Sequence, residues 1–275
     1  MAKQSDDLAA VATETRSILP YLLLKRPDAA PTGMLYDCVK HLHALNPNRN
    51  PKFSTRVIVT NADTLDAALN IPPSTRDQKP VLVLDMANAE VPGGGWLKGS
   101  SAQEESICYR SSLSFTLKRR FYPLKVTGAV YSPNVLVIRN SRRNGHTLLD
   151  LNHPEAMRTV SVVSVAAVQN PKLFKGASGQ RFYQNDQERS VMKHKIMNIL
   201  RIAGRQNHRR IVLGAFGCGV FGNPRGEVVR MFQEVLSSPE FKGWFESIVF
   251  AVLDSSASPL GNFAIFRDCL NGMKV

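Results

Sequence analysis

The stretch MANAEVPGGGWLKGSSAQEESICYRSS, residues 86–112, indicates both the kind of fold and the position of a binding site. It follows an apolar run at 80–85 that predicts a strand, and it contains three consecutive glycines and then Gln-Glu-Glu at 103–105. Glycines adopt backbone torsions that other residues avoid, so their amides can approach a ligand closely. In α/β proteins ligands bind beyond the carboxyl ends of strands, where these glycines stand. The stretch predicts an anion-binding turn beside two carboxyl groups.

Apolar runs and helical periodicities alternate along the rest of the chain. Strands are expected at 57–60, 80–85, 135–139, 159–168, 210–215 and 248–253. Helices are expected at 5–19, 32–44, 63–69, 103–117, 185–203, 224–236 and 262–270. Several strands are apolar at consecutive positions, as when helices bury both faces of a sheet.

This pattern predicts an α/β fold, a three-layer α/β/α sandwich with a mixed sheet. Residues 1–50 are expected to form a helical extension packed on a catalytic domain at 51–275. The polar segment 171–189 is expected to be a surface loop.

The composition is that of a globular protein with a strongly basic surface. The 275 residues are 43% apolar, and the net charge is +13 with a pI near 9.9. Such a charge favours anionic partners such as nucleic acid, a polyphosphate-like substrate or an acidic membrane surface, although a soluble basic surface explains it equally well. Basic clusters at 118–120, 139–143 and 201–210 have few interleaved aromatic residues, which argues against a stacking platform for single strands.

The cysteines and the apolar runs exclude several other classes. The four cysteines are widely spaced and lack zinc-site spacing, so neither a zinc site nor a disulfide scaffold is expected. No secretory signal and no run of ~20 apolar residues is visible. We therefore expect a soluble intracellular protein, nuclear or cytoplasmic, without a membrane partner.

A second glycine cluster, GAFGCGVFGNP at 214–224, follows the apolar run 211–213 and opens a helix whose first residue is expected to be Pro224. A glycine loop at a helix N-terminus is a natural diphosphate site, because free amides and the helix dipole face the anion. A tight strand-to-helix turn without a ligand is the alternative. The cluster matches G-x-G-x-x-G, but the next strand ends only at Asp254, and no G-K-[ST] follows, so neither a Rossmann domain nor a P-loop is supported.

The two glutamates have different explanations. Ser101 and Glu104 fit a capping box, whereas Glu105 has no such structural role. Consecutive helical residues point ~100° apart, so the pair is not expected to face one atom together. The two carboxylates of a conventional glycosidase lie ~5 Å or ~6.5–9.5 Å apart, which adjacent residues match poorly. We expect one glutamate to act in catalysis and the other to position a sugar.

These motifs together resemble the bacterial-type poly(ADP-ribose) glycohydrolases, a branch of the macrodomain superfamily that also occurs in fungi. The resemblance extends from about Thr13 to Asp254, and the triple glycine with its downstream Gln-Glu-Glu is its most specific part. The matching segments are Asn61 to Leu65, Ala87 to Ala89, Pro92 to Gly95, Gln103 to Glu105, Arg110 to Ser112, Tyr131 to Pro133 and Gly214 to Asn223.

The resemblance implies hydrolysis of ribose–ribose bonds in poly(ADP-ribose), with Glu105 as catalytic acid and base and Glu104 holding the ribose hydroxyls. Both glycine runs would wrap the diphosphate, Asn88 would bond the distal ribose, and Val220 and Phe221 would lie against that ribose. Asp63 is a candidate for the adenine. The substrate-binding residues implied are Asn88, Gly93, Gly94, Gly95, Gln103, Gly217, Cys218, Gly219, Val220, Phe221, Gly222, Asn223 and Asp63.

No metal or organic cofactor is implied. The partners implied are poly(ADP-ribose), ADP-ribosylated proteins and ADP-ribose as product, in the reversal of ADP-ribosylation and the DNA damage response. Burial beneath the polymer is expected to raise the pKa of Glu105, against the helix N-terminus, which favours the ionised form. The alternatives are a non-hydrolytic ADP-ribose-binding macrodomain, a mono-ADP-ribosyl hydrolase, and a basic nucleic-acid-binding protein.

Overall fold

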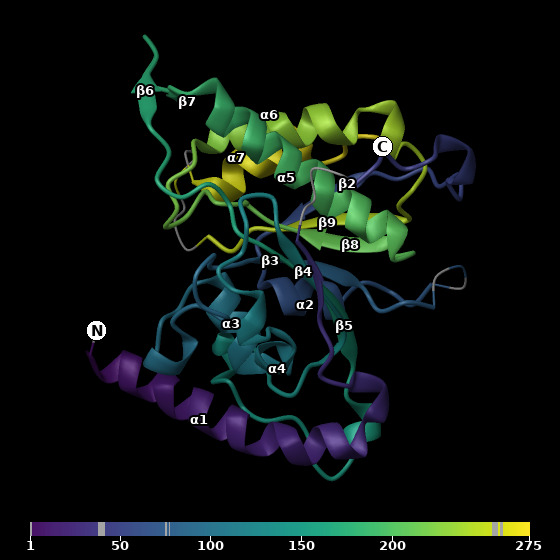
Figure 1. Cartoon of the computed structure of the whole chain (residues 1–275), viewed down its shortest axis with the longest axis vertical. Helices are drawn as coiled ribbons and strands as arrows, with labels where there is room; N and C mark the ends of the chain where they lie inside the picture. Colours follow the sequence, from purple (N-terminus) through teal and green to yellow (C-terminus); the bar gives the residue numbers. More distant parts are fainter. Residues whose placement is uncertain (1, 38–41, 75, 77, 255–257, 259–260) are drawn as a thin grey trace. The chain divides into compact units, whose positions relative to one another are not determined.

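The structure is a computed structural model that describes residues 2–37, 42–74, 76, 78–254, 258 and 261–275 (Figure 1). The chain divides into two compact units. Unit 1 comprises Met1–Asp37 and Asp85–Val165, and unit 2 comprises Cys38–Leu84 and Ala166–Val275. The predicted boundary between 1–50 and 51–275 stays a prediction.

Seven strands form a mixed sheet. They are β1 (Met34–Tyr36), β2 (Val57–Thr60), β3 (Leu82–Met86), β4 (Ala129–Leu136), β5 (Thr159–Val165), β8 (Arg210–Leu213) and β9 (Ser247–Ala251). Backbone pairing joins them in the order β1-β4-β5-β3-β8-β9-β2. Within unit 1, β1, β4 and β5 pair antiparallel; within unit 2, β3, β8, β9 and β2 pair parallel. The mixed sheet confirms the predicted α/β class.

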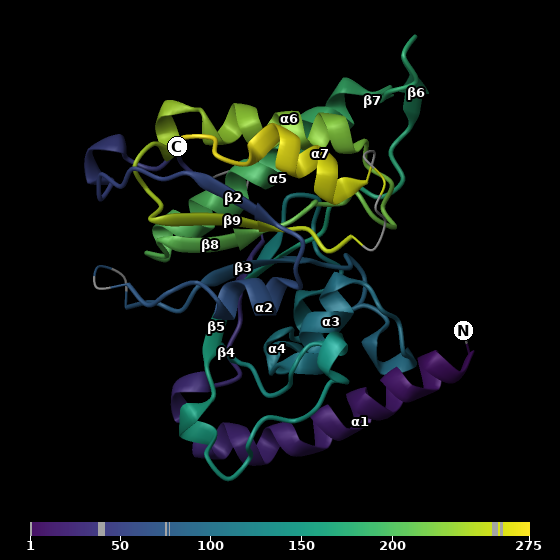
Figure 2. The same cartoon turned by 180° about the vertical axis from the view of Figure 1, so that it is seen from behind.

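The α-helices are α1 (Ala2–Lys25), α2 (Thr64–Leu69), α3 (Gln103–Arg110), α4 (Leu113–Thr116), α5 (Asp186–Arg205), α6 (Arg225–Leu236) and α7 (Asn262–Leu270). In unit 2, α5, α6 and α7 lie on one side of β8, β9 and β2, and α2 lies on the other (Figure 2). Strands β8 and β9 are apolar because both of their faces are covered, whereas Ile58 on one face of the edge strand β2 is exposed. No helix within the described ranges is long and apolar enough to cross a membrane.

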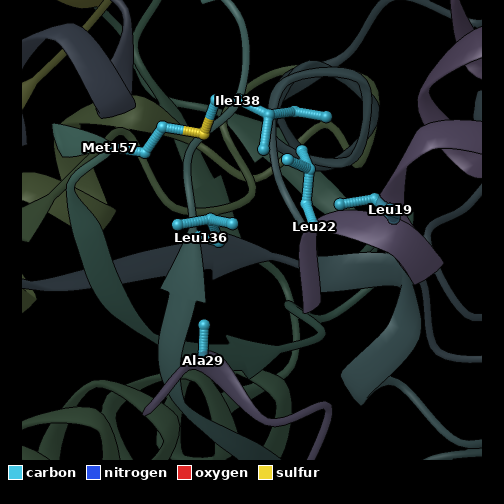
Figure 3. Close-up of a cluster of buried hydrophobic side chains, with 6 residues drawn as sticks. All are labelled: Leu19, Leu22, Ala29, Leu136, Ile138 and Met157. Atoms are coloured by element: carbon cyan, nitrogen blue, oxygen red, sulfur yellow. The ribbon is translucent and has the colours of Figure 1, made fainter. Parts of the chain in front are cut away.

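Helix α1 packs into unit 1 as the predicted N-terminal helix. It is longer than the expected 5–19 because its buried side chains continue past Pro20. Leu19 and Leu22 join Leu136, Ile138 and Met157 in one apolar cluster (Figure 3). Each buried side chain of this kind contributes roughly 1.5–3 kcal/mol to the stability of the fold. The helix therefore belongs to the core of unit 1.

The predicted helix at 32–44 is wrong for its first part. Met34–Tyr36 forms β1, which pairs antiparallel with β4. A Cβ at Gly33 would lie 2.5 Å from the backbone oxygen of Thr116, so the chain packs closely there. Pairing with the edge of β4 therefore overrides the helical periodicity. Residues 38–41 of this prediction lie outside the described residues, and 42–44 are not helical.

Two further expectations are corrected. The helix expected at 103–117 breaks into α3 and α4, because Ser111 bridges Val137 and the backbone N–H of Ser112 donates to Leu136 O at 2.9 Å. The segment expected as a loop at 171–189 contains an antiparallel hairpin, β6 (Leu173–Lys175) and β7 (Arg181–Tyr183), and the first turn of α5.

Candidate active site

The start of α3 is attached to the end of β3 by Gln103. Its Oε1 accepts a hydrogen bond from the backbone N–H of Met86 at 2.9 Å. This bond fixes the first turn of the helix against the strand that precedes the glycine turn. The structure thus gives Gln103 a positioning function, while its contact with substrate stays a prediction.

The carboxyl group of Glu104 bridges the two ends of the segment 88–93, which leads from β3 to the glycines. Its Oε2 accepts from the backbone N–H of Asn88 at 2.7 Å, and its Oε1 accepts from that of Gly93 at 3.0 Å. The capping-box prediction is wrong, because Ala102 is the N-cap of α3 and no side chain caps it. The carboxyl group turns instead toward the loop, where two backbone donors need an acceptor.

Glu105 turns toward the same loop. Its Oε1 accepts a hydrogen bond from the backbone N–H of Gly95 at 2.9 Å. The side chains of Glu104 and Glu105 are buried, with 3% and 8% of their surface exposed. Among the described residues no donor contacts Oε2 of Glu105, so this oxygen is available to a ligand.

The two glutamates converge on Gly94, contrary to the expectation that they face different ways. A Cβ at Gly94 would lie 2.5 Å from Oε1 of Glu105 and 3.1 Å from Oε2 of Glu104. The Cβ atoms of consecutive helical residues do diverge by ~100°. Three rotatable bonds in each glutamate bring the carboxyl groups back together around the turn.

Two of the three glycine amides donate to the protein's own acids. Gly93 and Gly95 donate to the two glutamates, and Gly94 donates to Val91 O at 3.0 Å. Gly93 and Gly94 have φ of +73° and +56°, in the left-handed region where side chains are strained. The turn therefore supplies backbone N–H donors to the carboxyl groups of Glu104 and Glu105. Contact of these glycines with a diphosphate stays a prediction.

Asn88 lies at the beginning of this turn. Its Oδ1 accepts from the backbone N–H groups of Glu90 at 2.8 Å and Val91 at 3.0 Å. This is an Asx-type turn, which fixes the orientation of the side chain. The oxygen of Asn88 is thus occupied by the turn, and the contact of its amide NH₂ with a ribose stays a prediction.

Asp85 is an acidic residue of this site that the sequence analysis did not assign. It is fully buried in β3, and neither carboxyl oxygen has a hydrogen-bond partner in bonding geometry among the described residues. Burial raises its pKa to about 7, the Ser164 hydroxyl opposes this shift, and the charge of Glu105 adds to it. The signal was an aspartate at the end of an otherwise apolar strand, directly before the motif.

The acids influence one another's ionisation. Burial, followed by the Asp85 carboxyl, raises the pKa of Glu104 well above its ordinary value, whereas the N–H groups of Asn88 and Gly93 oppose the shift. Burial and the same acids raise the pKa of the Cys108 thiol. Several buried acids in one place cannot all ionise cheaply, so the cluster retains protons at neutral pH.

Further hydrogen bonds around Tyr109 hold the turn that follows the glycines. The Tyr109 hydroxyl lies 2.9 Å from Trp96 O and 2.7 Å from Ser100 O, at both ends of the turn that follows the glycines. Thr15 of α1 donates to Tyr109 O at 2.8 Å, and Arg139 donates to Thr15 Oγ1 at 2.7 Å. Trp96, considered at first for the rim of the pocket, is buried against the Tyr109 ring.

The second glycine loop lies in unit 2, between β8 and α6, and Asn223 braces it. Its Nδ2 donates to Gly217 O at 3.0 Å and to Val168 O at 2.7 Å. Its Oδ1 accepts from the Tyr183 hydroxyl at 2.7 Å. A Cβ at Gly217, where φ is +71°, would lie 2.5 Å from Asn223 Nδ2. The loop is therefore tightly built around these two residues.

The middle of this loop leaves amides unpaired. Within the described chain, the backbone N–H groups of Gly219, Val220 and Phe221 donate to no protein acceptor, whereas that of Gly222 donates to Gly219 O. Val220 is 85% exposed. Cys218 is buried, and burial raises the pKa of its thiol to about 12, which fits packing. Free amides beside a helix N-terminus favour an anion.

Two residues of unit 2, Pro224 and Asp63, are helix N-caps, a position that the sequence analysis did not assign to them. Pro224 is the N-cap of α6 and not its first residue. Asp63 is the N-cap of α2, and its Oδ1 accepts from the backbone N–H groups of Leu65 at 2.8 Å and Asp66 at 3.2 Å. Its contact with adenine stays a prediction. No group of three or more His, Cys, Asp or Glu suited to a metal ion occurs among the described residues.

Comparison with known proteins gives a consistent result. The family description "Microbial-type PARG, catalytic domain" matches residues 5–140. The poly(ADP-ribose) glycohydrolase from Thermomonospora curvata is 28% identical, with a TM-score of 0.74 over 95% of this chain and 98% of that chain. The same enzyme from Deinococcus radiodurans, in complex with ADP-ribose, is 28% identical, with a TM-score of 0.67 over 86% and 94%. A search of curated proteins found no significant match.

The mixed sheet with helices, and the buried acid pair that accepts hydrogen bonds from a glycine turn, define a macrodomain-like α/β fold with an acidic site. Within that class, the chain belongs to the microbial-type poly(ADP-ribose) glycohydrolases. The family predicted from the sequence is thereby confirmed.

Proposed function

We propose that this protein hydrolyses the ribose–ribose O-glycosidic bonds of poly(ADP-ribose) and releases ADP-ribose, with Glu105 as the general acid and base. The observation that supports this most directly is the Glu105 carboxyl group, which is buried, held through Oε1 by the Gly95 N–H, and open to a ligand at Oε2. Its family and its solved relatives, one of them in complex with ADP-ribose, agree with this assignment.

The reaction needs one group that first gives and then takes a proton. Glu105 would protonate the leaving 2′ oxygen as the bond to the anomeric carbon breaks. It would then accept a proton from the water that attacks this carbon, which restores the acid. One water is consumed: its hydroxyl goes to the anomeric carbon of the released unit, the 2′ oxygen of the other product becomes a hydroxyl, and no cofactor takes part. One side chain can serve both halves because the second is the reverse of the first in proton direction.

Glu104 and Asp85 would supply the environment that this acid requires. Glu104 would hold the ribose hydroxyls, with its carboxyl group fixed by Asn88 and Gly93. The raised pKa values of Glu104 and Asp85 leave protons in the cluster at neutral pH. A cluster that is partly neutral avoids the repulsion of three adjacent anions.

In unit 2, the Gly217–Asn223 loop would bind diphosphate through the amides of Gly219, Val220 and Phe221. Their free N–H groups and the start of α6 support this, since both carry positive charge toward an anion. Asp63, at the start of α2, would address the adenine. The protein's role would then be reversal of ADP-ribosylation on modified proteins, including after DNA damage, in the nucleus or cytoplasm.

The deciding experiment compares wild type with Glu105→Gln on automodified polymer, measuring ADP-ribose release. We expect the variant to lose about 10²–10⁴-fold in rate, the usual contribution of a general acid–base. Glu90→Gln is the matched control, because Glu90 lies on the same turn with an exposed side chain and should keep full activity. Calorimetric titration of ADP-ribose should show that Glu105→Gln still binds the product.

Three results would redirect the proposal. ADP-ribose binding without turnover by wild type would indicate a non-hydrolytic macrodomain. Turnover of mono-ADP-ribosylated protein but not of polymer would indicate a mono-ADP-ribosyl hydrolase. Steeply salt-dependent binding of DNA or RNA that ADP-ribose does not compete would indicate a nucleic-acid-binding protein.

A further inference from the structure

The β6–β7 hairpin of unit 2 is a small two-stranded ribbon with its own surface chemistry. Leu173 pairs with Tyr183, Phe174 with Phe182, and Lys175 with Arg181. Figures 1 and 2 show β6 and β7 extending beyond the end of α6. Tyr183 is buried at the base, and the ribbon becomes exposed toward its tip.

One face of the hairpin carries an exposed aromatic stack. The rings of Phe174 and Phe182 lie 5.4 Å apart at an interplanar angle of 25°. The Arg230 guanidinium lies 5.4 Å from the Phe182 ring, so that ring is covered. Phe174 is 51% exposed, which is unusual for a phenylalanine in an ordered strand. Its outer face is a flat apolar surface on which one base can stack.

The same ribbon is strongly basic. Lys172, Lys175 and Arg181 are exposed, and no acidic residue occurs from Lys172 to Asn185. The nearby acids of α6 are occupied: Glu227 pairs with Arg189 at 3.0 Å and Glu234 with Lys193 at 2.5 Å. The nearest acids along the chain, Asp186 and Glu188, lie beyond the hairpin in the first turn of α5. The hairpin itself therefore presents three cations and no acid around one exposed ring.

The base of the hairpin is tied to the second glycine loop. The Tyr183 hydroxyl donates to Asn223 Oδ1 at 2.7 Å, and the backbone N–H of Asn170, just before β6, donates to Phe221 O at 2.9 Å. Both ends of the ribbon are thus fixed to the Gly217–Asn223 loop, to which the proposed function assigns a diphosphate. A chain of repeating diphosphates leaving that loop would pass the hairpin.

We propose that the β6–β7 hairpin binds further units of the poly(ADP-ribose) chain, with an adenine stacked on Phe174 and diphosphates beside Lys172, Lys175 and Arg181. This inference rests on the proposed function. Each polymer unit carries one base and two phosphates, which matches one exposed ring among three cations. A single-stranded nucleic acid has one phosphate per base, and its binding grooves carry successive aromatic residues, which this ribbon lacks.

The test compares substrates of different length. Phe174→Ala and, separately, the double variant Lys175→Ala/Arg181→Ala are assayed on long polymer and on the two-unit substrate. We expect KM for long polymer to rise about fivefold to tenfold, the lower range for the loss of one stacked base. The kcat, and KM for the two-unit substrate, should stay within twofold of wild type.

The controls are substitutions of the same kind elsewhere. Tyr21→Ala removes an exposed aromatic ring of α1, and Arg119→Ala/Arg143→Ala removes two exposed cations of unit 1. Both should leave KM for long polymer unchanged. Equal KM values for wild type and both hairpin variants on long polymer would overturn the proposal, as would an equal rise of KM on the two-unit substrate.

Binding in the Glu105→Gln background separates this proposal from the proposed function. Fluorescence anisotropy of labelled polymer reports on the hairpin even if no variant releases ADP-ribose. Polymer binding that weakens with Phe174→Ala supports the hairpin surface whatever the turnover. If Phe174→Ala weakens binding of an oligoadenylate strand and leaves polymer binding intact, the surface binds nucleic acid and the proposal is wrong.

Discussion

The backbone N–H of Gly95 donates a hydrogen bond to Oε1 of Glu105 at 2.9 Å, and the neighbouring Gly94 leaves no room for a side chain beside the same oxygen. The glycine turn and the acid are therefore one structural element. The glycines are needed because the carboxyl groups of Glu104 and Glu105 occupy the space beside this turn, whether or not the turn also contacts a ligand.

Gly94→Ala should uncouple the turn from the acid. The new Cβ would lie 2.5 Å from Oε1 of Glu105, and φ is +56°. Left-handed backbone costs an alanine roughly 1–2 kcal/mol, and a displacement of ~1 Å at a catalytic group can cost about 10²-fold in rate. We expect kcat to fall more than about tenfold. Gly145→Ala is the control, because φ is +65° but nothing lies within 4 Å of the added Cβ. Equal losses of activity in both variants would contradict this explanation.

Glu104→Gln should destabilise unit 1 although the side chain keeps its shape. Both carboxyl oxygens accept backbone N–H groups, from Asn88 and Gly93. A glutamine amide has one oxygen, so one buried donor would face an NH₂ group and remain unpaired. This costs about 1–3 kcal/mol, which urea unfolding can measure. Glu90→Gln should leave the unfolding free energy within about 0.5 kcal/mol of wild type, because it changes an exposed side chain. Unchanged stability of Glu104→Gln would show that the two hydrogen bonds do not form in solution.

The buried Asp85 should make stability depend on pH. Its pKa is raised from 3.8 to about 7, so the folded chain binds more protons than the unfolded chain between these values. Its contribution is therefore fully present below about pH 4 and is lost as the pH rises through about 7, by an amount on the order of a few kcal/mol. The unfolding free energies of wild type and Asp85→Asn, plotted against pH, should converge or cross as the pH rises from 4 to 8. The Asp85 carboxyl also helps to raise the pKa of Glu104, so the difference between the two proteins includes the change that Asp85→Asn causes in the titration of Glu104. Parallel curves for wild type and Asp85→Asn would contradict the prediction. The control is Asp150→Asn, which changes an exposed aspartate of unit 1 and should give a curve parallel to that of wild type.

Tyr109→Phe should loosen the turn behind the acids. The hydroxyl lies within hydrogen-bond distance of Trp96 O and Ser100 O, and it is buried. Its loss should lower the unfolding free energy by about 1–2 kcal/mol, since a buried carbonyl loses its donor. If the turn aims the Gly95 N–H at Glu105, kcat should fall several-fold while KM stays within twofold. Tyr21→Phe changes an exposed ring and should alter neither quantity. A fall in stability without a change in kcat would limit Tyr109 to a structural function.

Periodicity predicted most of the elements because their side chains are buried on regular faces. The strands β2 and β9 and the helices α5, α6 and α7 lie close to their expected ranges. Met34–Tyr36 was missed because a three-residue edge strand has too few residues to show a period, and pairing with β4 decides its conformation. The hairpin at 173–183 was missed because most residues of the segment are polar or glycine and its two strands are only three residues long, which is typical of loops.

The sequence by itself determined the α/β class, the family, and the two motifs that carry the candidate site, because glycine runs and adjacent acids are local patterns that a single chain displays. Only the tertiary structure decided that Glu104 and Glu105 converge on Gly94, that the glycine amides hold these carboxyl groups, and that Asp85 joins them. The physical reason is that hydrogen-bond partners and burial are set by residues brought together in space. Helical spacing determines the direction of the Cβ atom of each glutamate, and the N–H donors nearby determine the position of its carboxyl group.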